Sequence, residues 1–544
     1  MVTVLDDLRI AGILSIEPEI PAEPRDEIER LKSTSSWRLT APLRRVRMVR
    51  SELRPGAVSR SGALRRRLLA VAPHLVDGEF ATSSTLSILR QVTAAVARAQ
   101  DDARLWLLFS ATAGALPDAD EFAALRRALV WARDDAAAAR TVLQHAVALM
   151  DRSHSHYRDI DIREREVVVD VDYCATHGFT SGVQRVVRET LRRWRSHEGL
   201  YLAAWDSEGR AMRPLTDDEI ERTTAWHRGH RRIIDMQGAH GATVSVIPWR
   251  STVLLPEVAA DRFAPRLAAL ASHSGNRVVA IGYDTIPATD GFFVAPEQSQ
   301  SFARYLTILK GVDQIVAISR AAAAEFAGFI EAVAAQGVAG PQITVLALPE
   351  EVPAEPADPA PPAEIPLVLA VGSHEIRKNH VVIADAAEIL WREGLKFILL
   401  FAGGSGPEWY TDLDDRVTEL VLAGRTVAIV EGISDEELAQ AYAAARVQIV
   451  VSLHEGFGLP VVESLSAGTP VITSERGSMA EIAEAGGCVV VDPESVTALA
   501  DAMRRLLTDD EELERLRGEI ADRPRTTWND YADRLWQVVG GGRP

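Results

Sequence analysis

Residues 447–474 have the sequence VQIVVSLHEGFGLPVVESLSAGTPVITS, and this segment indicates the class of fold. It begins with a continuous apolar run typical of a buried strand, VQIVVS at 447–452. HEGFG then supplies a turn, and Pro460 suits the first position of a helix that Gly468 ends. A second β-rich run, PVITS at 470–474, follows. Strand, turn, helix and strand in this order predict a βαβ unit of a parallel sheet.

The same alternation of β-rich runs and amphipathic helical segments extends on both sides of this unit. In residues 166–350 the runs are VVVDVDY, VVAIGYD, QIVAIS and ITVLALP, and in residues 366–540 they include LVLAVG, KFILLFAGG, TVAIVEG and CVVV. Between these regions, residues 351–365 form a proline-rich, acidic linker. The sequence therefore predicts an α/β fold with two doubly wound, Rossmann-like domains that face a cleft. Ligands of such sheets collect beyond the carboxyl ends of the strands.

Residues 1–165 have a different composition, rich in Ala, Arg, Leu and Asp. Apolar residues recur at helical spacing, as in EFAALRRALVWARDDAAAARTVLQHAVALM at 121–150, which predicts an α-helical amino-terminal region. Within it, a basic arm at 31–67 carries ten arginines and one lysine against Glu52, a local charge of +10. We expect this arm to contact an anionic membrane surface or a partner enzyme, or else to form a solvated helix that pairs with the chain's own acids.

Composition and charge exclude several classes of protein. Of the 544 residues, 47% are hydrophobic and 25% are charged, which are ordinary globular values. The net charge of −18 argues against a protein that wraps nucleic acid. The amino terminus carries acids where a signal peptide needs positive charge, and no apolar run approaches the roughly 18 residues of a spanning helix. We therefore expect a cytoplasmic protein, at most peripheral to the inner face of the cell membrane.

Two glutamates of the segment quoted first are candidate ligands for a sugar. Glu455 lies in the turn after the strand and Glu463 lies one turn inside the helix, so both can face the cleft. The backbone amides around Phe457, Gly458 and Leu459 point out of the helix start, where the helix dipole favours a phosphate. Carboxylates beside a phosphate site are suited to charge-assisted hydrogen bonds with the hydroxyls of a sugar and a ribose.

Glu455 and Glu463 have seven residues between them, within EGFGLPVVESLSAGTPVI. This arrangement resembles the E-x7-E signature of retaining glycosyltransferases of family 4 (glycosyl transferases group 1), and the resemblance extends along most of residues 167–540. It implies a GT-B fold in which Glu455 holds the donor sugar and Glu463 holds the ribose of a nucleotide-diphosphate sugar. STSSWRLTAPLRRV, residues 33–46, resembles a segment found beside bacterial surface-polysaccharide glycosyltransferases and methyltransferases.

AVGSHEIRKNH, residues 370–380, resembles the phosphate-binding loop of the same family. The resemblance implies that Arg377 and Lys378 contact the donor diphosphate, where fixed positive charge offsets the charge that grows on the leaving group. Many relatives have an arginine directly after the glycine, where this chain has Ser373, so Arg377 is expected to supply that charge instead. A solvated Arg-Lys pair at a helix start is the structural alternative.

Three further segments resemble loops of the family's cleft. FAGGSG and EGISDEEL resemble the loops around the base and the ribose, where Gly404 and Ile433 are expected as backbone contacts. CATHGFTSGVQRVVRE resembles the first glycine-containing loop, in which Gly182 lets the backbone approach the diphosphate. Thr180 and Ser181 in this loop are equally good candidates for helix caps.

The acceptor side of the cleft is expected near GYDTIPATDG, which has Tyr283 where many relatives have histidine and keeps Asp284. A tyrosine can hydrogen-bond a sugar hydroxyl but does not readily exchange a proton near neutral pH. Ser319 matches a family serine at a strand end, and it is also a good cap for the next helix. His454 directly precedes Glu455, so it is expected to contact donor or acceptor, or to be a hydrogen-bonded packing residue.

We expect no metal ion and no cofactor apart from the nucleotide-sugar substrate itself. His154 and His156 form a His-x-His pair without a third candidate ligand nearby. Asp170 and Asp172 lie within a predicted strand, where the alternation suggests structural positions.

The sequence and the resemblance together predict a metal-independent glycosyltransferase of polysaccharide biosynthesis. It would transfer a sugar with retention from a nucleotide-diphosphate sugar to a glycan or lipid-linked acceptor. A nucleotide-sugar epimerase would instead convert the donor without an acceptor. A catalytically idle, glycosyltransferase-like scaffold of an assembly complex would bind no nucleotide.

Overall fold

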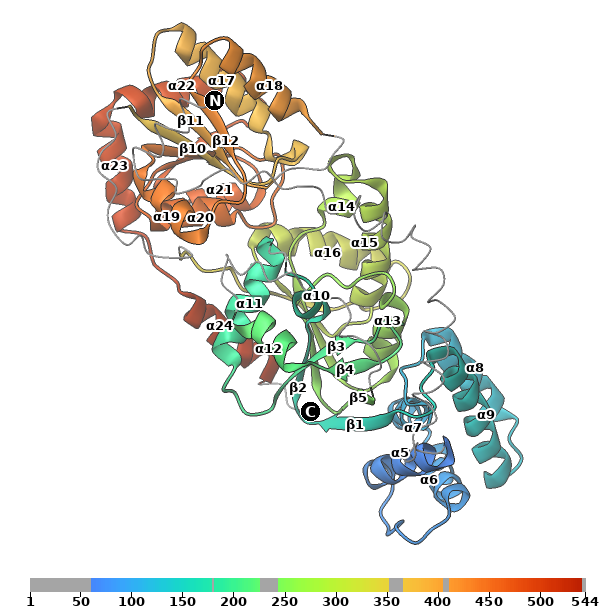
Figure 1. Ribbon diagram of the computed structural model, residues 1–544. Helices are drawn as coiled ribbons and strands as arrows, with labels where there is room; N and C mark the ends of the chain where they lie inside the picture. The colour runs from blue at the N-terminus through green and yellow to red at the C-terminus, as the bar shows by residue number, and fades with distance from the viewer. Residues whose placement is uncertain (1–59, 179–180, 226–242, 352–364, 405–409, 541–544) are drawn as a thin grey trace, which may run out of the picture.

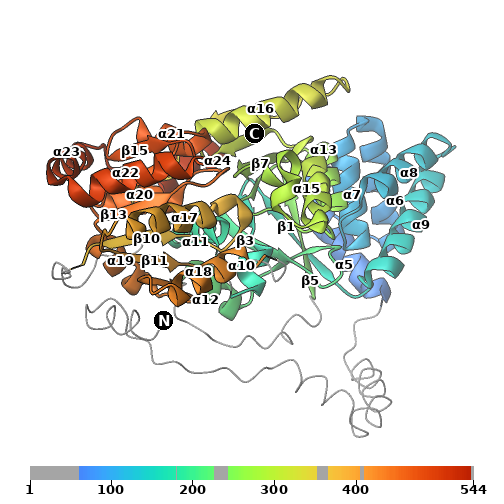
Figure 2. The same cartoon turned by 90° about the horizontal axis from the view of Figure 1, so that it is seen from above.

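The computed structural model describes residues 60–178, 181–225, 243–351, 365–404 and 410–540. Most of the basic arm, the linker at 352–364 and Thr180 therefore lie outside the described residues. Figures 1 and 2 show the amino-terminal helices and the second domain at opposite ends of the first domain. Within the described residues, no helix is both long and apolar enough to span a bilayer. Cys174 and Cys488 are free thiols.

The first domain is built on a sheet with the strand order β1-β5-β4-β3-β2-β6-β7-β8-β9. All neighbouring pairs are parallel except those of the short strand β4, which is antiparallel to β3 and β5. The central order β3-β2-β6-β7-β8 is that of a doubly wound sheet, with a switch point beside β2. The strands are β1 (Asp159–Glu164), β2 (Val167–Asp170), β3 (Leu200–Trp205), β4 (Met212–Pro214), β5 (Val244–Trp249), β6 (Thr252–Leu255), β7 (Arg277–Gly282), β8 (Gln314–Ala317) and β9 (Gln342–Val345).

Helices cover both faces of this sheet and bury two separate apolar layers against it. The site described below depends mainly on α11, α14, α15 and α16, which follow the strands or their loops at the carboxyl edge (Figure 1). The helices of this domain are α10 (Asp172–Thr176), α11 (Gly182–Trp194), α12 (Asp217–Thr224), α13 (Ala264–His273), α14 (Ile286–Thr289), η1 (Gly291–Phe293), α15 (Pro296–Leu309) and α16 (Arg320–Ala334).

The amino-terminal helices pack against one edge of the first sheet. Helices α7, α8 and α9 each begin after an aspartate whose carboxylate accepts backbone amides, namely Asp101, Asp118 and Asp134. α5 contacts β1 and α7 contacts β5, so the helices and the sheet share one hydrophobic core. The helices are α5 (Arg60–Leu75), α6 (Thr85–Ala99), α7 (Asp102–Ala113), α8 (Ala119–Val130) and α9 (Asp135–Ser153).

The last arginines of the basic arm are used inside this helical bundle. Arg67 is fully buried, and its guanidinium donates to the backbone oxygens of Ser155 at 3.0 Å and Arg158 at 2.9 Å. Arg66 pairs with Asp159 at 2.8 Å. The described end of the arm therefore pairs with the protein itself, and Arg67 is not available to a membrane surface.

The second domain contains a fully parallel sheet with the order β12-β11-β10-β13-β14-β15. Numbered within the domain this is 3-2-1-4-5-6, the arrangement of a dinucleotide-type Rossmann fold with its switch point between β10 and β13. The strands are β10 (Leu367–Val371), β11 (Ile398–Ala402), β12 (Val427–Val430), β13 (Val447–Val450), β14 (Val471–Ser474) and β15 (Cys488–Val491). The helices are η2 (Ile376–Lys378), α17 (His380–Arg392), α18 (Asp412–Leu422), α19 (Asp435–Ala444), α20 (Leu459–Ser466), α21 (Gly477–Ala483), α22 (Val496–Thr508) and α23 (Asp510–Ala521).

The last helix, α24 (Trp528–Gly540), returns to the first domain (Figure 1). The indole of Trp194 in α11 donates to the backbone oxygen of Ala532 at 3.0 Å, and Arg277 donates to that of Val538 at 2.9 Å. The sequence places α24 in the region assigned to the carboxyl-terminal domain, whereas the structure packs it on the other domain. The expected α/β fold with two doubly wound domains and an amino-terminal helical region is confirmed.

Candidate active site

The loops after β10 and β13 meet at the switch point of the second sheet. Arg377 and Glu455 are 78 residues apart in the chain, yet their side chains are hydrogen-bonded. The backbone amide of Leu453 also donates to the carbonyl of Arg377 at 2.8 Å. A crevice opens at a switch point because the connections on its two sides cross opposite faces of the sheet. The structure thus brings together the residues that the sequence singled out in both loops.

Glu455 is the centre of a largely buried cluster of charges. Its carboxylate accepts hydrogen bonds from Arg377 Nη1 and Ser452 Oγ, both at 2.9 Å, and forms an ion pair with Lys378 Nζ. Burial by itself would raise the pKa of Glu455, but Lys378 and Arg377 outweigh this effect and lower the pKa to about 2. Glu455 is therefore ionised at neutral pH.

Arg377 and Lys378 are largely buried cations and not a solvated pair. Their side chains are only 19% and 10% exposed. Arg377 Nε also donates to Glu375 at 2.9 Å, and Ser373 Oγ donates to the other oxygen of Glu375 at 2.6 Å. Burial lowers the pKa of Lys378, and Glu455 offsets part of that effect. The loop after β10 therefore holds two cations in place before any ligand binds.

Two helix amino termini, one from each domain, lie beside each other here. α20 begins after Gly458, whose φ of +107° is a backbone conformation that favours glycine. α11 begins at Gly182, where a Cβ would lie 3.5 Å from Cδ1 of Leu459. Unpaired N–H groups and the positive ends of both helix dipoles favour an anion at such a place. The Phe457 ring is buried in the core, so only its backbone can face the cleft.

The two domains are in direct contact at Gly456. A Cβ on Gly456 would lie 2.3 Å from the backbone oxygen of Tyr283, so no other residue fits this approach. Ser319 Oγ donates to the carbonyl of Gly456 at 2.6 Å and accepts the amide of Ala322 at 2.9 Å. Ser319 is therefore both a helix cap and an interdomain contact. Ser181 occupies the N-cap position of α11, where its backbone amide donates to Gln184 Oε1 at 3.1 Å.

Glu463 is buried and paired on both of its carboxylate oxygens. Arg185 of α11 in the first domain forms an ion pair with Oε1, and Tyr442 of α19 donates to Oε2 at 2.7 Å. The side chains of Arg185 and Glu463 are 10% and 5% exposed. The sequence predicts that Glu463 holds a ribose, and in this structure its carboxylate pairs with Arg185 of the other domain and with Tyr442.

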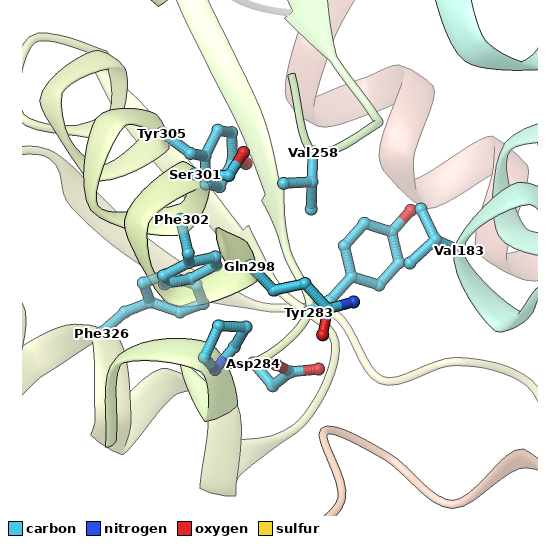
Figure 3. A pocket seen from close by; sticks show the side chains of 10 residues that line it. Val183, Val258, Tyr283, Asp284, Gln298, Ser301, Phe302, Tyr305 and Phe326 are labelled. Carbon is cyan, nitrogen blue, oxygen red and sulfur yellow. The ribbon is translucent and has the colours of Figure 1, made fainter. Parts of the chain in front are cut away.

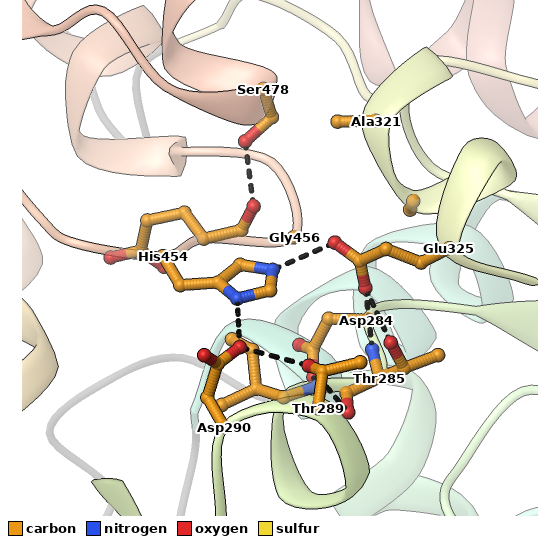
Figure 4. A network of polar contacts seen from close by, with 12 residues as sticks. Asp284, Thr285, Thr289, Asp290, Ala321, Glu325, His454, Gly456 and Ser478 are labelled. Carbon is orange, nitrogen blue, oxygen red and sulfur yellow. Dashed lines mark hydrogen bonds and ion pairs between the residues drawn. The ribbon is translucent and has the colours of Figure 1, made fainter.

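His454 also bridges the two domains, as Figure 4 shows. Its Nδ1 lies 2.6 Å from Asp290 and its Nε2 lies 2.7 Å from Glu325, both carboxylates of the first domain. The hydrogen bond to Glu325 is the main cause that raises the pKa of His454 to about 9, so the imidazole is charged at neutral pH. Of the two roles that the sequence left open, the structure supports the packing one, in the form of an interdomain ion pair.

Tyr283 and Asp284 lie at the carboxyl end of β7. The phenol of Tyr283 donates to the backbone oxygen of Pro256 at 2.8 Å, so its hydroxyl is engaged within the protein. Burial raises the pKa of the Asp284 carboxyl, while Arg377 lowers it. Asp284 lies at the domain boundary, where its Cβ would be 3.2 Å from a Cβ on Gly456, the residue after Glu455. Asp284 is therefore an acid of the first domain within the influence of the cationic loop.

Gly404 and Ile433 lie beyond the ends of β11 and β12. The carbonyl of Gly404 accepts the amide of His374 at 3.0 Å. A Cβ on Gly403 would lie 1.8 Å from the backbone oxygen of Gly372, so these two loops pack backbone to backbone. Ile433 is partly buried against the core. Both predicted residues thus border the same edge as the charged cluster, on the far side of β10.

Several residues of the site could not be recognised as functional from the sequence. Arg185 lies in the quoted segment GVQRVVRE but looks there like one of many solvated helix arginines. Tyr442, Asp290 and Glu325 belong to no motif. Their roles depend on contacts between segments more than 20 residues apart, which local pattern does not encode.

The described residues contain no group of three or more His, Cys, Asp or Glu side chains that could hold a metal ion. His154 ends α9, and His156 hydrogen-bonds an aspartate of the same helix. Asp170 accepts the indole N–H of Trp205 at 2.8 Å, and Asp172 accepts the backbone N–H of Trp205 at 2.9 Å. Both aspartates therefore have structural partners.

The family match to known proteins lies in the region of the second sheet. Residues 352–522 match the family of glycosyl transferases group 1. O-antigen chain mannosyltransferase B of Escherichia coli is 33% identical over 168 residues, which is 30% of this chain and 42% of that protein. The MMP alpha-(1->4)-mannosyltransferase of Mycolicibacterium hassiacum is 44% identical over 87 residues, 16% of this chain and 21% of that protein. The chain thus spans less than half the length of these relatives.

Solved structures to which the chain is similar include Alr3699/HepE of Anabaena in complex with UDP and glucose, with 11% identity and a TM-score of 0.48. That similarity covers 69% of this chain and 99% of the other. Sucrose-phosphate synthase from Thermosynechococcus elongatus has 19% identity and a TM-score of 0.45, covering 69% of this chain and 96% of the other. The family match spans the second sheet with Arg377, Lys378, Glu455 and Glu463. The similarity to glycosyl transferases group 1 thus covers the part of the chain that carries this charged cluster.

Proposed function

We propose that this chain is a retaining glycosyltransferase. It transfers a sugar from a nucleotide-diphosphate sugar to a glycan or lipid-linked acceptor in polysaccharide biosynthesis. The observation that carries the proposal is the largely buried cluster of Glu455, Arg377 and Lys378 beside two helix amino termini. The group 1 domain and the O-antigen mannosyltransferase relative support it.

When the donor binds, its diphosphate replaces carboxylates of the protein as the partner of Arg377 and Lys378. Without donor, the charges of Arg377 and Lys378 are balanced by Glu455 and Glu375. A diphosphate placed at the helix starts takes over the two cations through charge-assisted hydrogen bonds. Glu455 is then released to accept hydrogen bonds from hydroxyls of the donor sugar. No metal ion is needed in this scheme, because fixed cations and helix dipoles supply the positive charge.

The reaction breaks the bond between the anomeric carbon and the diphosphate oxygen and forms a bond from that carbon to the acceptor oxygen. The acceptor proton passes to the leaving phosphate oxygen on the same face, which retains the configuration. Negative charge grows on the diphosphate as it leaves, and Arg377 and Lys378 stabilise that charge in a site of low dielectric. Asp284 lies on the first-domain side of the same boundary, beside Gly456.

Glu463 remains the proposed ligand of the donor ribose. Its carboxylate is held by Arg185 and Tyr442, so the ribose would have to displace at least one of them. If it displaces Arg185, donor binding weakens a contact between the domains and is coupled to their relative position. The basic residues at 31–59 remain a proposed contact with an anionic membrane or a partner enzyme.

Replacing Glu455 tests the proposal. Glu455→Gln keeps the shape of the side chain but loses the charge that faces the sugar, so we expect kcat to fall by about 10²–10³-fold. Sugar transfer is measured with a panel of UDP-, GDP- and dTDP-sugars and candidate glycan acceptors, with product detected by mass. The matched control is Glu494→Gln, an exposed acid of the same domain that pairs with Arg476.

Each alternative predicts a different result from the same assay. Conversion of the donor sugar in the absence of any acceptor would indicate an epimerase. Failure of every nucleotide sugar to bind, measured by thermal shift, would indicate an idle scaffold. Unchanged turnover in Glu455→Gln would refute the role given to this carboxylate.

A further inference from the structure

An ionic bridge joins the loop after β7 in the first domain to the loop after β13 in the second (Figure 4). Glu325 of α16 lies at its centre. Its Oε1 is 2.7 Å from Nε2 of His454, and its Oε2 accepts both the amide and the hydroxyl of Thr285, each at 2.8 Å. Asp290 completes the bridge, since its Oδ2 is 2.6 Å from Nδ1 of His454. One imidazole of the second domain is thus held by two carboxylates of the first.

The bridge is attached to the chain directly beside two acids of the candidate site. Thr285 follows Asp284, and His454 precedes Glu455. The same two loops approach each other at Gly456, where a Cβ would lie 3.2 Å from the Cβ of Asp284. Any change in the length of the bridge therefore moves the Asp284 loop relative to the turn that carries Glu455.

The helix that carries Glu325 is itself anchored to the second domain. Ser319 Oγ, at the start of α16, donates to the carbonyl of Gly456 at 2.6 Å. Glu481 of α21 accepts the backbone amides of the first two residues of α16, at 2.9 and 3.2 Å. A carboxylate at a helix start satisfies amides that have no partner within the helix. The Glu325 carboxylate therefore has a defined position relative to the Glu455 turn.

The geometry of the bridge requires a charged imidazole. A neutral imidazole donates a hydrogen bond from only one ring nitrogen, whereas an imidazolium donates from both. Both ring nitrogens of His454 lie within hydrogen-bond distance of a carboxylate, so both act as donors. The hydrogen bond to Glu325 raises the pKa of His454 to about 9, in agreement with this geometry. Loss of the proton would break one of the two contacts.

Other charged groups lie around the bridge. On the first-domain side, Asp284 and Glu325 act on each other electrostatically. On the second-domain side, Glu481 faces the start of α16, and Glu455 is paired with its own two cations. Burial lowers the pKa of one of these, Lys378, so this lysine also loses its charge at alkaline pH. A loss of activity at high pH therefore does not by itself identify the bridge.

We propose that Glu325 and Asp290 are positioning residues of the sugar transfer, which hold His454 and thereby align the Glu455 turn with the Asp284 loop. This inference rests on the proposed function, in which Glu455 and its cations hold the donor. Misplacement of reacting groups by about 1 Å can lower a rate by about 100-fold. Because that cluster belongs to the second domain, loss of the bridge lowers kcat and leaves the KM for the donor nearly unchanged.

Glu325→Gln tests the proposal on the full-length protein. The variant keeps the size of the side chain and an acceptor for Thr285, but it has no charge to hold the imidazolium. The substrate is whichever member of the panel of UDP-, GDP- and dTDP-sugars the wild type turns over. We expect kcat at pH 7 to fall about five- to tenfold and the donor KM to stay within about twofold. The matched control is Glu331→Gln, an exposed glutamate of the same helix, which should leave both values within about twofold.

The pH profile is the readout that a merely structural role would not move. The kcat of the wild type should fall as pH rises through about 9, because His454 then loses its proton. In Glu325→Gln this fall should occur at least about one pH unit lower, whereas a fall caused by Lys378 should not move. Asp290→Asn should shift the fall in the same direction, and thermal unfolding checks that each variant is folded. An equal loss at every pH, without a shift, would overturn the proposal.

A double variant tests whether Glu325 acts through the histidine. Added to His454→Asn, Glu325→Gln should lower kcat by less than about twofold further, because the contact is already lost. A further five- to tenfold loss would contradict the proposed route. If the wild type transfers sugar but Glu325→Gln has the same kcat and pH profile, only the positioning role fails. If the wild type neither binds nor turns over any nucleotide sugar, the proposed function fails and this inference fails with it.

Discussion

The two domains present opposite chemistry where they meet. The second domain contributes ions, with Glu455, Arg377 and Lys378 packed against one another at a switch point. The first domain contributes a cavity of about 260 Å³ with mostly apolar walls at the carboxyl end of β7 (Figure 3). A diphosphate leaving group needs fixed positive charge, whereas a neutral sugar needs shape and a few hydrogen bonds. The contrast therefore agrees with a donor on one side and an acceptor on the other.

The largest expected effect comes from removing a cation of the second domain. Lys378→Gln should lower kcat by about 10²–10³-fold, because the charge on the leaving diphosphate loses a fixed partner. Steady-state kinetics at saturating donor measure this loss. Lys310→Gln, which changes an exposed lysine bonded to Gln336 in the first domain, should leave kcat within about twofold. A small effect of Lys378→Gln would contradict the role of fixed positive charge that is assigned to the second domain.

The buried ion pair between Arg185 and Glu463 links the first domain to the second. Arg185→Met leaves the Glu463 carboxylate with Tyr442 but without its cation, so we expect the free energy of unfolding to fall by about 3 kcal/mol. Denaturant unfolding measures the change. The double variant Arg185→Met with Glu463→Gln should recover part of it, since no buried charge is left uncompensated. No recovery would show that Arg185 acts mainly through its packing.

The His454 ion pair makes the contact between the domains sensitive to pH. Its pKa of about 9 lies above the ordinary value of about 6.5, so its stabilising effect is complete below pH 6.5 and is lost as pH rises through 9. The facing acids are Asp290 and Glu325, and the lowered pKa of Glu325 adds a loss at the acidic end, below its ordinary range. We expect about 1–2 kcal/mol of stability to disappear between pH 7 and 10, allowing for partial exposure.

Thermal unfolding at a series of pH values measures this effect. The difference between wild type and His454→Asn isolates it from other groups that titrate in the same range. The difference should be large at pH 7 and nearly absent at pH 10. A difference that does not change with pH would show that His454 acts by packing and not by charge.

An effect of similar size is expected at Ser319. Ser319→Ala loses one hydrogen bond to the carbonyl of Gly456 and the cap of α16, and we expect about 1–2 kcal/mol of lost stability. Denaturant unfolding measures this loss. The control is Ser299→Ala in α15, which removes a hydroxyl that has no hydrogen-bond partner among the described residues. A loss confined to Ser319→Ala would assign the effect to the domain contact and the cap, whereas equal losses would contradict that assignment.

Much of the fold could be predicted from local pattern. The central strands of the second sheet appear as apolar runs, such as LVLAVG for β10, because parallel strands inside a sheet are buried on both faces. The strands β1, β5 and β4 at one edge of the first sheet could not be predicted in this way, because they are not continuous apolar runs. β1 has the polar sequence DIDIRE, β4 has only three residues, and β5 contains Pro248. Their pairing depends on the helical bundle and on neighbours distant in the chain.

The same division holds for the candidate site. Glu455, Arg377 and Lys378 were found because they lie in recognisable loops, and the sheet order then brings those loops together. The interdomain partners of Glu463 and His454 could not be found, since each comes from the other domain. Nor could the sequence distinguish the buried Arg67 from the other basic residues of the arm.

The sequence by itself determined which segments are strands and helices in the parallel core and which loops carry charge. These properties follow from periodicity and residue type over a few neighbouring positions. Only the tertiary structure decided which charges pair, where α24 packs and which buried hydroxyls are left without a partner among the described residues. Pairing and burial depend on the distance between segments far apart in the chain, and that distance is set by packing of the whole molecule.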